Sequence, residues 1–245
     1  MPVGKWNLEF GETSCTLGRV FSVGTREASL GFRAEPPERR FSLLLAVPDT
    51  MLADSARSII VSAPGVVPVV VMAPLRAVPL KPGVKRVDIS LEVEKLASLV
   101  SAKEISIKGA GKAINIQIGG SVEAVTAMTK CEDDLMREWK IDPAALERIA
   151  TFPKPIDLVN WVSSNDYPAA PQLALQGGTV GALIRIDETG KVQECRVIDS
   201  SADRDLDDTT CRLVLMRGHY SPAMDKDGHP VPSWDRAKFR WQIPF

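Results

Sequence analysis

This sequence has almost no net charge, no long hydrophobic run and only two histidines. The formal net charge is −1 at pH 7, so the chain lacks the basic surface that binds nucleic acid or an anionic membrane. Its longest apolar run, residues 66–75, is too short to span a bilayer and is interrupted by Pro68 and Pro74. We therefore expect neither a nucleic-acid partner nor a transmembrane segment.

Catalytic and metal-binding motifs are absent as well. The two histidines, His219 and His229, flank a turn without a third ligand in register, and no Cys-x-x-Cys pair occurs, so the pattern is not that of a zinc site. Ser200-Ser201 lacks the Gly-x-Ser-x-Gly frame of a nucleophile elbow. The sequence predicts no cofactor, no metal and no enzyme activity.

Acidic residues and serines are better explained as helix starts. The acids within residues 203–208 lack the glycine and the distal glutamate of a calcium-binding loop. Together with Ser200-Ser201 they suit the start of a helix that Gly218 closes, because free N–H groups there attract oxygen ligands. Ser90 likewise suits the cap of a brief helix. The acidic residues therefore predict the start of a helix and not a calcium site.

The length and composition are those of a globular protein with two domains. A chain of 245 residues exceeds the usual size of one domain, and 44% hydrophobic with 25% charged residues excludes a disordered chain. We expect a β-rich domain over residues 1–140, a connector over residues 141–160 and a second domain over residues 161–245.

The first domain is predicted to consist mainly of strands. Residues 6–118 contain short runs in which apolar and polar side chains alternate, the period of a half-buried strand. Glycines within residues 109–111 predict a hairpin, and Pro68 favours a sheet edge for the run at residues 66–72. Residues 121–139 follow helical spacing. We expect a sandwich or barrel with one helix docked on it.

The last third predicts a smaller α+β domain. Residues 179–187 alternate, and the turn at residues 187–190 ends in glycine, so residues 192–198 should return antiparallel. A helix over residues 206–217 and a final strand over residues 233–243 follow. This order predicts a three-stranded antiparallel sheet with one covered face.

The motifs of this last third resemble TonB C-terminal domains. They appear in the order Tyr167-Pro168, a strand at 178–187, Gly190-x-Val192, residues 197–201, Leu206-Asp207, Pro222-Ala223 and Gly228-x-Pro230. The resemblance implies a periplasmic domain that adds a strand from the peptide of an outer-membrane transporter to its own sheet edge. Residues 163–166 differ from the Gln- and Pro-rich stretch that contacts this peptide in the best-known members.

The final strand supplies most of the predicted partner-binding residues. It alternates charged or polar side chains with aromatic ones, and at a sheet edge its free N–H and C=O groups could pair with another strand. We predict that a partner contacts Tyr167, Pro168, Lys238, Phe239, Arg240, Trp241 and Gln242. The alternative is that Lys238 and Arg240 only protect the edge against aggregation.

The four cysteines are divided equally between the two domains. Cys195 on the returning strand and Cys211 on the next helix could face each other, and such a bridge would stabilise the fold by about 3 kcal/mol. Cys15 and Cys131 remain for a second bridge. An even number fits an oxidising compartment, and four reduced, buried cysteines are the alternative. No signal peptide is visible, so the protein is either cytoplasmic or has lost its signal. The cysteines favour the second alternative, and we expect a periplasmic protein whose signal has been removed.

These observations predict a non-enzymatic, disulfide-bonded periplasmic protein that docks a protein or peptide of the cell envelope by strand addition. An outer-membrane transporter is one candidate partner. Two alternatives stay open: an enzyme with its site in the first domain or between the domains, and a self-assembling envelope component that forms a homodimer through its edge strand.

Overall fold

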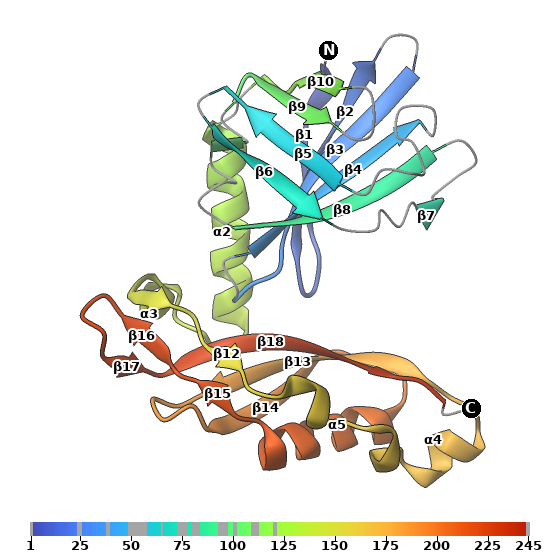
Figure 1. The fold of residues 1–245 in the computed structure, drawn as a ribbon, viewed down its shortest axis with the longest axis vertical. Helices are drawn as coiled ribbons and strands as arrows, with labels where there is room; N and C mark the ends of the chain where they lie inside the picture. The colour runs from blue at the N-terminus through green and yellow to red at the C-terminus, as the bar shows by residue number, and fades with distance from the viewer. Residues whose placement is uncertain are drawn as a thin grey trace. The chain divides into compact units, whose positions relative to one another are not determined.

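The computed structural model describes two compact units, Met1–Leu135 and Met136–Phe245. Within them it describes residues 2–23, 26–37, 40–48, 58–64, 66–72, 78–79, 84–92, 98–99, 102–108, 113–119 and 122–243. Both units combine antiparallel sheets with helices (Figure 1), which confirms the predicted α+β class. None of the described helices is both long enough and apolar enough to cross a membrane.

The N-terminal unit is built from two antiparallel sheets. The larger has the order β1-β2-β3-β4-β8-β7, formed by Pro2–Phe10, Cys15–Val23, Arg26–Ala34, Arg40–Pro48, Val84–Glu92 and Val78–Pro79. The smaller has the order β10-β9-β5-β6, formed by Ala113–Gln117, Glu104–Lys108, Ser58–Ala63 and Val66–Met72. Inward side chains of both sheets belong to one buried cluster, so of the two predicted arrangements, sandwich or barrel, the sheets form the sandwich.

A long helix completes this unit. Helix α2, Val122–Glu138, stands beside the two sheets (Figure 1) and, within this unit, buries Met128 and Cys131 in the same apolar cluster. A disulfide between Cys15 on β2 and Cys131 joins helix to sheet across 116 positions of sequence. The helix is therefore docked on the sandwich by packing and by a covalent bond.

Most local predictions for the N-terminal unit are confirmed. Strand β6, which contains Pro68, lies at the edge of its sheet, and β9 pairs with β10 as a hairpin; the glycine turn at 109–111 lies outside the described residues. The helix start at Ser90 is wrong. Ser90 lies within β8 and is in register with Ser42 of β4, because strand pairing overrides the capping preference of a serine.

The C-terminal unit has one main sheet. Its order is β14-β13-β18, formed by Val192–Asp199, Gly178–Ile186 and Ser233–Trp241, all antiparallel. Helix α5, Arg204–Arg217, packs against β13 and β14 on one face (Figure 1). The predicted three-stranded sheet with a covered face is confirmed.

Short elements surround this sheet. They are α3 Pro143–Glu147, β11 Ile149–Thr151, β12 Lys154–Pro155, η2 Leu158–Asn160, η3 Ser164–Asp166, α4 Ala169–Leu173, β15 Tyr220–Ser221, β16 Ala223–Asp225 and β17 Pro230–Val231. Strand β11 pairs with β16, and β12 pairs with β15. Residues 141–160, predicted as a connector, thus contribute strands to the second unit. Trp161 beyond them is buried, with its ring 5.2 Å from that of Tyr220.

Polar side chains define both ends of the β14 to α5 connection. Asp203 is the N-cap of α5 and accepts the Leu206 N–H at 3.1 Å. The hydroxyls of Ser200 and Ser201 instead donate to the carboxylate of Asp207 at 2.5 and 2.8 Å. The predicted helix start is therefore correct, but an aspartate fills the cap, and the two serines anchor the first turn through Asp207.

Candidate functional site at a sheet edge

Strand β18 lies at one edge of the C-terminal sheet. Among the residues that the structure describes, β13 is its only strand partner, and every residue from Ser233 to Trp241 is in register with a residue of β13 without a bulge. An edge strand directs one side of its main chain away from its neighbour. β18 therefore presents a regular, extended backbone on which a further antiparallel or parallel strand can pair.

The other edge of the sheet is irregular. Strand β14 also pairs with β13, but its register shifts between Gly181 and Ala182 and again between Arg185 and Ile186. Bulges bend a strand and increase its twist, and proteins use them to blunt exposed edges. A disulfide between Cys195 and Cys211 further ties β14 to α5. Of the two edges, β18 is the one suited to strand addition.

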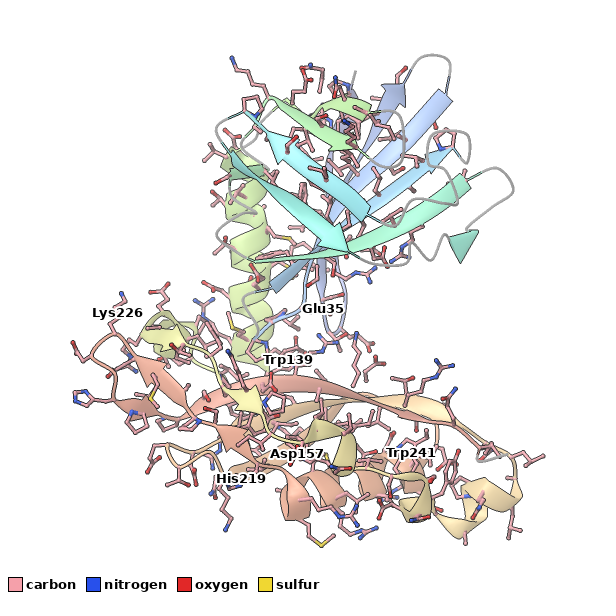
Figure 2. All side chains as sticks on the ribbon, viewed as in Figure 1. Glu35, Trp139, Asp157, His219, Lys226 and Trp241 are labelled. Carbon is pink, nitrogen blue, oxygen red and sulfur yellow. A yellow bond between two sulfur atoms is a disulfide. The ribbon has the colours of Figure 1, made fainter. Side chains whose placement is uncertain are left out.

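From Ala237 to Trp241 the side chains of β18 alternate between the core and the solvent. Lys238 and Arg240 are exposed, whereas Phe239 and Trp241 are 6% and 4% exposed. The indole N–H of Trp241, labelled in Figure 2, donates to the Thr210 hydroxyl of α5 at 2.9 Å. Phe239 and Trp241 therefore fix the edge from beneath, and their side chains are not accessible to a partner in this conformation.

Tyr167 is buried beside the same edge. Its ring stands edge-on to that of Trp241, with centroids 5.2 Å apart, and its hydroxyl donates to the Gln176 carbonyl at 2.5 Å. Burial raises the pKa of this phenol. Pro168 is partly buried as the residue before α4, and Gln242 is exposed just after β18. Of the predicted contact residues, Lys238, Arg240 and Gln242 reach the surface, and Tyr167 supports Trp241.

An ion pair holds the segment before Tyr167 in place. The guanidinium of Arg217 donates to both carboxylate oxygens of Asp166 at 2.7 Å and to the Trp161 carbonyl at 3.1 Å. This hydrogen bonding, joined by the N–H and hydroxyl of Ser163, holds the pKa of Asp166 well below its usual range. Sequence reasoning missed the pair, because 51 positions separate its two members.

All four cysteines are paired in two disulfides. Cys15 joins Cys131, and Cys195 joins Cys211, with Cα atoms 6.2 and 5.3 Å apart. The pairings are those predicted from the sequence, and the alternative of four reduced cysteines does not apply to this structure. Each unit thus contains one bridge, as expected for a protein of an oxidising compartment.

The histidines do not form a shared site. His219, labelled in Figure 2, precedes β15 and forms an isolated backbone β-bridge with Lys191, whereas His229 lies in the turn between β16 and β17. Ligand atoms of Asp225, Asp227 and His229 fall within 4.8 Å of one another. The Asp225 carboxylate already accepts the N–H groups of Asp227 and His229 at 2.9 and 2.8 Å, which lowers its pKa. This arrangement is that of a tight turn.

Comparison with protein families assigns the C-terminal region. Residues 163–243 match the family of Gram-negative bacterial TonB protein C-terminal domains, and residues 1–162 lie outside this match. No curated protein matches the chain. Domains of this family are not enzymes and bind outer-membrane transporters. The chain therefore carries a TonB C-terminal domain at residues 163–243, joined to an N-terminal β sandwich.

Proposed function

We propose that this chain is a periplasmic protein whose TonB C-terminal domain docks an envelope partner by strand addition along β18. The observation that best supports this proposal is the contrast between the two edges of the sheet. Strand β18 is regular throughout its length, whereas β14 is bulged twice. A peptide of an outer-membrane transporter is the partner that the family favours. Both disulfides fit an oxidising compartment such as the periplasm.

Main-chain hydrogen bonds would supply the affinity of this docking. Each contributes about 0.5–1.5 kcal/mol net, so several along one strand suffice for a reversible complex. The exposed side chains of Lys238, Arg240 and Gln242 would contact the side chains of the added strand. Phe239 and Trp241 would stay buried and keep the edge straight. Specificity would thus come from polar contacts beside a backbone ladder.

Site-specific photo-cross-linking in the cell envelope tests where the partner binds. A photoreactive residue in place of Arg240 or Gln242 should give a cross-linked adduct. The matched control is Arg204 on α5, whose side chain is 92% exposed. Adducts of equal yield from Arg204, or none from β18, would contradict docking at this edge. An adduct between two copies of the chain would favour the homodimer instead.

Hydrogen exchange distinguishes strand addition from side-chain docking. Adding the partner peptide identified by cross-linking should protect backbone amides between Phe239 and Gln242, while amides of β14 keep their exchange rates. Protection confined to α5 or to β14 would contradict addition at β18. The measurement reads the main chain itself and does not depend on how any substitution affects folding.

A further inference from the structure

On the outer face of the six-stranded sheet, two glycines stand side by side on neighbouring strands. Gly18 on β2 is in register with Gly31 on β3, and the same row continues to Asn7 on β1 and Leu44 on β4. The neighbouring residues Leu17 and Phe32 point into the core, so both glycines face outward. Two adjacent strands therefore leave a depression in this face.

A cavity of about 390 Å³ occupies this depression. Its lining runs across β1, β2, β3, β4 and β8, and its apolar side chains include Val3, Val20, Leu44 and Ala46. Five strands about 4.8 Å apart span roughly 19 Å, so the trough crosses most of the sheet, and it is open to solvent. Its volume lies within the range of small-molecule sites, about 300–1,000 Å³.

Neither backbone conformation nor crowding requires the glycine at position 18. Gly18 and Gly31 are not among the glycines with positive φ, and a Cβ at Gly18 would meet no atom closer than the Leu30 carbonyl at 4.0 Å. At Gly31 a Cβ would lie 3.3 Å from the Leu17 carbonyl. Glycine inside a strand costs stability, roughly 0.5–1 kcal/mol relative to alanine. The effect of glycine at position 18 is to leave the trough open, because a larger side chain there would enter it.

The charges around the trough favour an anionic ligand. Lys5, Arg19 and Arg86 line it against one acid, Glu9. The Arg86 guanidinium is paired with Asp88 at 2.8 and 3.0 Å, and that of Arg19 donates to the carbonyls of Gly4 and Ile118. Lys5, exposed at the β1 end, is then the cation best placed to bind a ligand's head group.

We propose that this trough binds a fatty acid, with its single acyl chain along the Gly18–Gly31 row and its carboxylate at Lys5. The apolar floor suits an acyl chain, and the absence of aromatic side chains among the lining residues argues against a sugar ring stacked there. This site lies in the unit without a family match and is independent of strand docking at β18.

Titration with the fluorescent fatty acid cis-parinaric acid tests the site on the full, oxidised chain. Binding should be saturable and displaced by palmitate. Hexadecanol, which has the same chain length without the charge, should compete at least about tenfold less well. Equal competition by hexadecanol would overturn the role of Lys5, and the absence of saturable binding would overturn the site. Displacement by anionic phospholipid vesicles but not by palmitate would overturn the assignment to a free fatty acid.

Substitutions locate the ligand. Gly18→Val should fill the trough and abolish binding, whereas Ser42→Val adds the same side chain to the same face outside the lining and should keep it. Lys5→Gln should weaken palmitate about tenfold and leave hexadecanol unchanged. If Gly18→Val fails to fold, judged by near-UV circular dichroism, Ser29→Phe blocks the trough from β3. Unchanged binding in a folded blocking variant would overturn the proposal.

Discussion

The N-terminal unit encloses one core between a six-stranded and a four-stranded sheet, whereas the C-terminal unit covers one face of a three-stranded sheet with a single helix. The first unit closes its fold with a disulfide across 116 positions, and the second with one across 16. In the small unit, loops are also fixed by carboxylates such as Asp166 and Asp187. In the C-terminal unit, a short-range disulfide and side-chain hydrogen bonds stabilise the fold in place of a second sheet, and one regular sheet edge stays exposed.

Removing the long-range disulfide should have the largest effect on stability. Replacement of Cys15 and Cys131 by serine releases a loop of more than a hundred residues, for which chain entropy predicts a loss of about 5 kcal/mol. Urea denaturation read by amide hydrogen exchange in β2 and β3 measures this. Amides of β13 should be unaffected. A loss shared equally by both sets of amides would contradict two separately stabilised units.

The short-range disulfide should matter less. Replacement of Cys195 and Cys211 by serine should cost about 3 kcal/mol, because the loop that it closes is shorter. Exchange should accelerate in β14 and α5, while β2 and β3 stay as in the parent protein. The ranking of the two double variants is the test, and a larger loss here than for the Cys15 and Cys131 pair would refute the chain-entropy explanation.

The hydrogen bond beneath the β18 edge comes next. Thr210→Val keeps the size of the side chain but removes the acceptor of the buried Trp241 N–H, so the variant should lose about 1–3 kcal/mol. Thr209→Val on the same helix, where the side chain is only partly buried, is the matched control. Thermal unfolding compares the two, and equal losses would show that helix propensity, not the Trp241 bond, is responsible.

The smallest effect should depend on pH. Hydrogen bonds from the Thr189 hydroxyl, and from the N–H groups of Thr189 and Lys191, lower the pKa of Asp187 from 3.8 to about 2. A lowered pKa in the folded state stabilises the protein above the ordinary pKa and loses this effect as the pH falls toward 2. Asp187→Asn should therefore be less stable than the parent at pH 6, and the difference should shrink by pH 2.

The adjacent Glu188→Gln is the control for that titration. It removes one charge from the same turn but none of the hydrogen bonds to Asp187. Melting temperatures of the parent and both variants between pH 2 and pH 7 give the comparison. A constant difference between the parent and Asp187→Asn across this range would mean that the carboxylate charge has no part in holding the hairpin.

Much of the C-terminal unit was predictable because its signals are local. Alternation of apolar and polar side chains predicted β13, and the acidic residues and Gly218 predicted the start and end of α5. The turn before Lys191 requires glycine at position 190, because its φ is +86° and a Cβ there would lie 2.0 Å from the Tyr220 carbonyl. The candidate edge was also predicted. Which of its residues face outward was not fully predicted, because Tyr167, Phe239 and Trp241 pack on elements distant in sequence.

The sequence by itself determined the periods of the strands and helices, the even set of cysteines and the TonB C-terminal motifs, because each depends on residues close together in the chain. Only the tertiary structure decided that β18 is a regular edge, that Asp166 pairs with Arg217, and that Gly18 and Gly31 lie side by side. Such features depend on register between distant segments. A period shows which face a residue occupies, but long-range packing decides which residue lies beside it.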